Sequence, residues 1–179
     1  MNAQSAILSG LWIAWAIYWA VAARNVKVTQ RAEPLASRIA FAIPVTIAVI
    51  LLAGRVEPPS AETYWIGTAL VAAGLGFSVW ARLHLGRNWS GNVTIKQDHE
   101  LIRTGPYRFV RHPIYSGLLL AFVGTAIVRG EWRGAAALAI LFVAVWRKLK
   151  IEERFMSETF GDAYARYREE VRALIPFVL

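Results

Sequence analysis

The stretch RTGPYRFVRHPIYSGLLLAFVGTAIV, residues 103–128, changes its chemistry at the midpoint. Residues 103–117 hold three arginines, two prolines, two tyrosines and a histidine. The following residues carry no charge, so residues 113–128 form an apolar run that begins with a proline. Proline suits the first turn of a helix, where its missing N–H costs little. The stretch therefore predicts an apolar helix that starts directly behind a cationic and aromatic loop.

Four more uncharged runs accompany this one. They cover residues 6–23, 39–54, 63–81 and 134–146 of a chain that is 56% hydrophobic. A bilayer core of roughly 30 Å requires about 20 helical residues, a length that the runs 6–23 and 63–81 approach. Arginines at both ends can extend the run 39–54, whereas the run 134–146 is short enough for a re-entrant helix. Because only residues 129–133 separate the last two runs, we favour a tight hairpin of two spans. The fold class expected is an all-α polytopic membrane bundle of about five transmembrane helices.

The positive charges support this arrangement. Seventeen of the 20 lysines and arginines fall in the loops 24–38 and 82–111 and in the tail from Arg147, and three fall in the other two loops. The positive-inside rule then predicts an outside N-terminus and a cytoplasmic C-terminus. The net charge of +8 is thereby explained by a basic inner face at the lipid bilayer, without nucleic acid. The short outer loops favour a prokaryotic inner (plasma) membrane.

Two polar segments remain outside these runs. The loop 82–112 contains NVTIK, residues 92–96, whose alternation indicates a brief strand. The tail is expected to continue the last span as a helix that breaks at Phe160-Gly161. Asp162 would cap a second helix, amphipathic through Tyr164, Tyr167, Val171 and Leu174, which Pro176 would end. Such a helix lies on the membrane surface or covers the bundle.

Adjacent carboxylates follow the last span. The tight hairpin places Glu152 and Glu153 at the same membrane face as Arg111, His112 and Pro113. Ionisable groups that cluster at a membrane edge indicate a functional site, although a solvated patch is the alternative. The chain has no cysteine, and its three histidines are far apart in sequence, so no metal site is predicted.

These groups belong to an ordered set of short motifs. The set consists of Thr104-Gly105-x-Tyr107, Arg111-His112-Pro113-x-Tyr115-x-Gly117, Glu152-Glu153, Phe160-Gly161-x-x-Tyr164-x-x-Tyr167, and Val171 before Ile175-Pro176. In this order, with a helical hairpin between the halves, residues 86–176 resemble the isoprenylcysteine carboxyl methyltransferase family and its phospholipid-methylating relatives. The first three spans match only as apolar helices.

The resemblance implies a cofactor and a site. Family members bind S-adenosylmethionine on the cytosolic side. The cofactor-binding residues implied here are Tyr107, Arg111, His112, Pro113, Tyr115, Tyr164 and Tyr167. Glu152 or Glu153 would contact the cofactor or the acceptor, and Arg147 would orient an acidic acceptor. One membrane domain, residues 1–179, would then combine a three-span region (residues 1–82) with a cofactor-binding and catalytic region (residues 83–179).

Methyl transfer from a sulfonium is an in-line displacement, so positioning is the main catalytic device, and aromatic faces can stabilise the cationic donor. A lipophilic acceptor would arrive from the bilayer and the cofactor from water. Two other interpretations stay open, namely an NADPH-dependent membrane reductase of the sterol-reductase type and a non-enzymatic scaffold. The acceptor atom (oxygen, nitrogen or sulfur) and the oligomeric state are also open.

Overall fold

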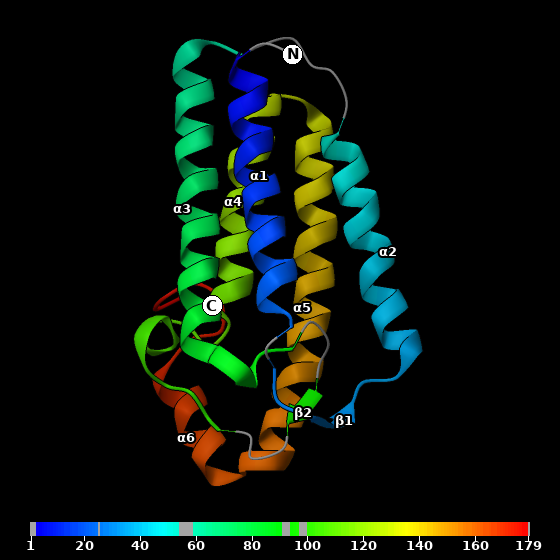
Figure 1. Cartoon of the computed structure of the whole chain (residues 1–179), viewed down its shortest axis with the longest axis vertical. Coiled ribbons are helices and arrows are strands. Elements are labelled where there is room, and N and C mark those ends of the chain that lie inside the picture. Colours follow the sequence, from blue (N-terminus) through cyan, green and yellow to red (C-terminus); the bar gives the residue numbers. More distant parts are fainter. Residues whose placement is uncertain (1–2, 25, 54–58, 91–93, 97–99, 179) are drawn as a thin grey trace.

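The chain forms a bundle of long helices, with two short strands, loops and a further helix gathered at one end (Figure 1). The computed structural model describes residues 3–24, 26–53, 59–90, 94–96 and 100–178. The α-helices are α1 (Ala3–Ala22), α2 (Leu35–Leu52), α3 (Ala61–Leu85), α4 (Pro113–Arg129), α5 (Trp132–Phe160) and α6 (Asp162–Glu170). From α1 to α5 the chain runs alternately down and up the long axis, and α6 lies at the lower end (Figure 1). The mostly helical architecture predicted from the sequence is confirmed.

Each uncharged run forms the body of one long helix, although residue 54 of the second run lies outside the described residues. Helices α1 and α2 and the segment 61–88 are long and apolar enough to cross a membrane, whereas α4 is a shorter apolar helix. Helix α5 extends well past its apolar stretch, to Phe160. The count of five spans therefore remains a prediction.

Glycines bring α3 and α4 into close contact. A Cβ on Gly74 would lie against the backbone oxygen of Gly117 and 2.6 Å from the backbone nitrogen of Ala121. A second pair, Gly67 and Gly124, repeats this approach farther along the helices. Small residues let helix backbones pack closely in membranes, where dispersion contacts replace the hydrophobic effect. The α3–α4 pair is thus the rigid centre of the bundle.

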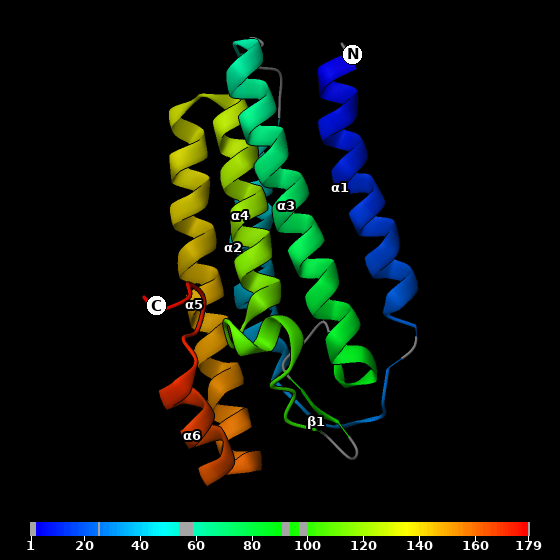
Figure 2. The ribbon, with the colours of Figure 1, turned by 90° about the vertical axis from the view of Figure 1, so that its left-hand side faces the viewer.

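The remaining long helices pack on either side of this pair. Helix α1 contacts α3, while α2 packs mainly on α5, and Figure 2 shows α1 standing apart from the other helices at the edge of the bundle. The Trp12 indole donates to the hydroxyl of Thr125 over 3.1 Å, and the Trp15 indole donates to Ser78 over 2.8 Å. Because α1 and α2 rest on different partners, space remains between them in front of α4.

The polar end contains a short two-stranded sheet that the sequence had only half indicated. β1 (Thr29–Ala32) pairs antiparallel with β2 (Thr94–Lys96). β2 is the described portion of NVTIK, of which residues 92 and 93 lie outside the described residues. Arg31 ties β1 to α5 by an ion pair with Glu158 at 2.7 Å. The sheet closes the polar end beneath α1 and α2.

The tail differs from its prediction in two details. The break at Phe160-Gly161 is confirmed, but Gly161 caps α6 with a positive φ of 49°, and Asp162 is the first helical residue without a capping side-chain bond. Helix α6 ends at Glu170, so Val171 and Leu174 are not on it and Pro176 does not end it. The reason is a competing pairing, because Arg172 forms a parallel bridge with Val110 and the backbone leaves the helix to reach it.

Candidate functional site

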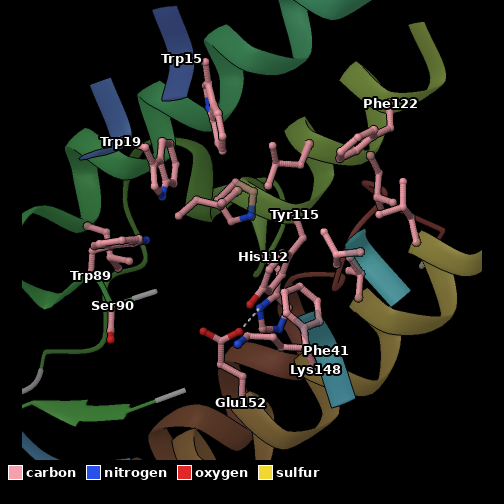
Figure 3. Close-up of a pocket in the computed structure, with 18 of the residues that line it drawn as sticks. Trp15, Trp19, Phe41, Trp89, Ser90, His112, Tyr115, Phe122, Lys148 and Glu152 are labelled. Atoms are coloured by element: carbon pink, nitrogen blue, oxygen red, sulfur yellow. Dashed lines mark ion pairs between the residues drawn. The ribbon is translucent and has the colours of Figure 1, made fainter. Parts of the chain in front are cut away.

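A cavity of about 800 Å³ runs through the bundle between α1, α2 and α4. Its upper walls are apolar and include Trp12, Trp15 and Phe122. Its lower end is polar and contains His112 and Glu152, as Figure 3 shows. A cavity of this kind, with an apolar channel above a polar end, can hold a molecule that is apolar along most of its length and polar at one end.

His112 lies at the boundary between the apolar and polar ends. It precedes Pro113 at the N-terminal end of α4, and its side chain is buried. Its Nδ1 lies 3.7 Å from Oε2 of Glu152, and its Nε2 lies 3.4 Å from Oε1 of Glu153 (Figure 3 draws the first pair). The histidine and both glutamates therefore meet at one point, as the sequence predicted from motifs about 40 residues apart.

Arg111 and Glu153 form a buried pair behind this histidine. The Arg111 guanidinium donates to Oε1 of Glu153 from Nε over 3.0 Å and from Nη2 over 2.5 Å. Its Nη1 donates to the backbone oxygen of Val171. Glu153 does not line the cavity, whereas Glu152 does. The two glutamates therefore have different positions. Glu152 faces the cavity, whereas Glu153 contacts Arg111 and His112 behind it.

The C-terminal segment, residues 171–174, fixes the same two residues through its backbone. The Arg111 amide donates to the oxygen of Arg172 over 2.8 Å, and the His112 amide donates to Ala173 over 3.0 Å. The Ser116 hydroxyl donates to Leu174 over 2.6 Å. The end of the chain therefore acts as a clamp on the start of α4.

Tyrosines surround the polar end. Tyr107, Tyr115, Tyr164 and Tyr167 all line the cavity, together with Arg111, His112 and Pro113. The Tyr167 hydroxyl donates to the backbone oxygen of Tyr107 over 2.5 Å, which joins α6 to the loop before α4. All seven residues proposed for the cofactor are therefore gathered around one space.

Arg147 is not among these residues. Its side chain is exposed and does not line the cavity, whereas the next residue, Lys148, is buried and does. Neighbouring helix residues point about 100° apart, so only one of the two can face inward. The Lys148 ammonium donates to Oε1 of Glu33 over 3.0 Å and lies 4.6 Å from the Phe41 ring.

Sequence reasoning missed this buried pair, although one signal was available. Glu33 is the only acid in the basic loop 24–38, and Ser37 donates to its other oxygen over 2.6 Å. A buried charge requires a partner, but the distance of 115 residues to Lys148 hides that partner from the sequence.

Three buried oxygens at the polar end lack a hydrogen-bond partner among the described residues. They are Oδ1 of Asn88, Oγ1 of Thr94 and Oε2 of Glu152, and all three residues line the cavity. Buried polar atoms are normally hydrogen-bonded. The site is thus complementary to a ligand that carries several N–H or O–H donors.

Burial and charge tune the acids of the site. Burial by itself would raise the pKa of Glu153, but hydrogen bonds and charge from His112 and Arg111 lower that pKa to about 2. Burial raises the pKa of Tyr107, Tyr164 and Tyr167 above the ordinary tyrosine value. At neutral pH Glu153 is therefore an ionised carboxylate behind the cavity, and Tyr107, Tyr164 and Tyr167 are neutral phenols that line it.

The fold and this cavity define a helical membrane protein whose site joins a polar pocket to an apolar channel. The sequence model of the phospholipid methyltransferase family matches residues 62–163, more than half of the chain. The chain belongs to this family. The prediction of a membrane methyltransferase, made from the ordered motifs, is thereby confirmed, and such an enzyme requires a methyl donor.

Individual relatives agree with the family. Protein-S-isoprenylcysteine O-methyltransferase B of Arabidopsis thaliana is 27% identical over 161 residues, which are 85% of this chain and 80% of the relative. Methanethiol S-methyltransferase 1 of Bradyrhizobium diazoefficiens is 37% identical over 71 residues, 40% of this chain and 24% of the relative.

A solved structure shares the fold. The eukaryotic intramembrane Ras methyltransferase, an isoprenylcysteine carboxyl methyltransferase, superposes with a TM-score of 0.54 at 23% identity. The superposition covers 79% of this chain, which spans about half of that relative (51%).

Proposed function

We propose that this protein uses S-adenosylmethionine to methylate the polar end of a lipophilic acceptor of the isoprenylcysteine type. One observation carries the proposal: the cavity joins the cluster of His112 and Glu152 to a channel walled by tryptophans. A polar methyl donor in the cluster and an apolar acceptor in the channel can meet where the cluster and the channel join. The names of the relatives support a methyl donor and an isoprenyl acceptor.

The proposed topology is based on the distribution of lysines and arginines along the sequence. Five spans place the N-terminus outside and the polar end of the bundle in the cytoplasm of a prokaryotic inner membrane, as the positive-inside rule requires. Residues 1–179 act as one domain. Its three-span region, residues 1–82, walls the channel, and its second region, residues 83–179, supplies most of the polar site.

The residues present fit the proposed methyl donor. S-adenosylmethionine supplies an electrophilic methyl group on a sulfonium, and its hydroxyl and amino groups are donors. Asn88 and Thr94 offer oxygens that accept no hydrogen bond from a described residue, and Glu152 adds a carboxylate oxygen 3.7 Å from His112. Tyr107 and Tyr167, tied together by a hydrogen bond, close the pocket over them. Arg111 and Glu153 hold His112 in place and are positioning residues.

Lys148 replaces Arg147 as the residue that orients an acidic acceptor. Its ammonium has three donors, one of which Glu33 receives. Lys148 lines the cavity next to Glu152, so a carboxylate at the end of the channel can be bound and directed there (Figure 3). A carboxylate is nucleophilic without a base, so positioning carries the reaction.

A methyl-transfer assay with tritiated S-adenosylmethionine and purified protein in detergent tests the proposal. We expect transfer to N-acetyl-S-farnesylcysteine and none to its methyl ester, which lacks the acceptor carboxylate. Glu152→Gln should lower the rate at least tenfold, whereas Arg147→Gln, at an exposed position of α5 outside the cavity, should change it less than twofold. Transfer to methanethiol but not to the farnesyl compound would replace the proposed acceptor by a small thiol. Transfer to neither would contradict the proposal.

A further inference from the structure

A second hollow lies on the opposite side of Arg111 from the cavity, between α5, α6 and the end of the chain. We name it the basic groove; its lining includes Trp146, Arg168, Glu169, Arg172 and Val178. Its volume is about 570 Å³. None of these five residues lines the cavity of the candidate site.

The charge of the groove is unbalanced. The Arg168 side chain is half exposed and lies 3.9 Å from the buried Glu153, which Arg111 already neutralises. Arg172 is exposed and forms no ion pair with any described residue. Glu169 is the one acid in the lining of the groove, as far as the described residues show. The unpaired Arg172 guanidinium, with the half-exposed Arg168 whose partner Glu153 is shared with Arg111, therefore leaves the groove positive. Such a groove is suited to a phosphodiester, which arginine binds through paired N–H donors.

The surroundings of the groove are those of a membrane interface. Trp146 stacks on Phe142, and the Lys150 ammonium lies 4.8 Å from its ring on the other side. Phe142 and Val143 are exposed on α5, one turn toward the apolar end of the bundle. Tryptophan and lysine in this order along a helix are typical of the boundary between acyl chains and headgroups.

The segment after the clamp adds apolar surface at the same level. Phe177 is 94% exposed and Val178 is 74% exposed, and Figure 2 shows this end of the chain projecting outward beside α5. A bilayer would cover these side chains and the exposed face of α5 together. The groove is thus continuous with the surface that lipid tails contact.

We infer that the basic groove binds the headgroup of an anionic membrane phospholipid, with the phosphodiester on Arg168 and Arg172 and the acyl chains along Phe142 and Val143. The wall of the groove is the clamp itself, because the backbone oxygens of Arg172 and Ala173 accept from Arg111 and His112. A lipid held there steadies the clamp and so links the composition of the inner leaflet to the site. The binding claim is independent of the proposed methyl transfer, while the link to activity depends on it.

Native mass spectrometry of the full chain from mixed micelles of phosphatidylglycerol and phosphatidylcholine tests the binding. We expect one phosphatidylglycerol to be retained in preference to phosphatidylcholine. Since a cation near an anionic lipid surface is worth about 1 kcal/mol, or roughly fivefold in affinity, the double variant Arg168→Gln with Arg172→Gln should lose roughly 25-fold in retention. Arg166→Gln, an exposed charge on α6 outside the groove, is the matched control and should lose less than twofold.

Three results would overturn the inference. One is equal retention of both lipids by the wild type, which needs no variant to fold. Another is a fivefold or larger loss of retention in Arg166→Gln, the loss expected for each arginine of the groove, which would indicate general surface charge. The third is displacement of the lipid by millimolar inorganic phosphate, which would make the groove a site for free anions. Failure of methyl transfer with intact lipid retention would count against the proposed function alone.

Discussion

At the scale of single residues, the site depends on charged side chains that set one another's pKa values. Glu153 is buried between Arg111 and His112, and its pKa of about 2 lies below the ordinary glutamate value. A carboxyl whose folded-state pKa is depressed stabilises the fold above its unfolded-state pKa, and this stabilisation is lost as the pH falls toward the folded-state value.

We therefore expect the free energy of unfolding to fall by on the order of 3 kcal/mol as the pH drops from about 5 to about 2. Thermal unfolding in detergent at a series of pH values measures this. Glu153→Gln should be less stable at pH 7, because Arg111 loses its partner, and should lack this component of the pH dependence. Glu169→Gln, an exposed control, should keep it. An unchanged pH profile in Glu153→Gln would show that the pair does not set acid stability.

The pair of Lys148 and Glu33 permits a second test, which separates folding from function. Removal of one partner leaves a buried charge and should cost about 3–5 kcal/mol. We expect Lys148→Met and Glu33→Gln each to lower the melting temperature, and the double variant to recover most of the loss. The KM for a carboxylate acceptor should rise in Lys148→Met and stay high in the double variant. Recovery of KM together with stability would make Lys148 a structural residue only.

Some of these residues could be predicted from the sequence and others could not. His112 and Glu152 belong to motifs on either side of a tight helical hairpin, and this order predicted that the two side chains lie close together. The choice between Arg147 and Lys148 could not be made, because both follow the last apolar run and only the packing of α2 against α5 decides which one faces the cavity. Glu33 was equally hidden, since its partner is remote in sequence.

At the scale of elements, uncharged runs predicted the long helices because a membrane excludes charge from its core. The polar extension of α5 carries no apolar signal, and its end at Phe160 was predicted from the Phe160-Gly161 break instead. The pattern after Gly161 did not predict the end of α6, because the bridge between Val110 and Arg172 is a tertiary contact. Periodicity alone extends a helix until a proline, whereas a backbone pairing can end it earlier.

The close packing of α3 on α4 predicts a sharp difference between two glycines. Gly74→Ala places a Cβ against backbone atoms of α4 that cannot move aside, so it should destabilise the bundle by about 1–3 kcal/mol. Gly76→Ala, two residues along the same helix, meets nothing within 4 Å and should be neutral or stabilising. Melting temperatures in one detergent provide the comparison. Equal effects of the two substitutions would contradict the packing described for α3 and α4.

At the scale of the whole molecule, the positive-inside rule predicts that the end of the bundle with α6 faces the cytoplasm. The chain has no cysteine, so single cysteines can be introduced without background. In intact cells a membrane-impermeant maleimide should label Glu131→Cys, between α4 and α5, and should leave Glu169→Cys, on α6, unlabelled until the cells are lysed. Labelling of both or of neither in intact cells would mean that α5 does not span and would reduce the number of spans.

The arrangement of the bundle is compatible with the two substrates of opposite polarity that we propose. The glycine-packed pair of α3 and α4 is the fixed support, and α1 and α2 stand on either side of the channel. The polar loops and α6 gather at one end, where the cavity becomes hydrophilic. We propose that this end binds the methyl donor and that Glu152 contributes to the binding.

Isothermal titration of the purified protein with S-adenosylhomocysteine, the product of the donor, tests this claim most directly. We predict saturable binding to the wild type and to Arg147→Gln, at least tenfold weaker binding to Glu152→Gln, and no binding of NADPH to any of the three. Binding of NADPH in place of S-adenosylhomocysteine, or equal affinity of Glu152→Gln and the wild type for S-adenosylhomocysteine, would contradict the account.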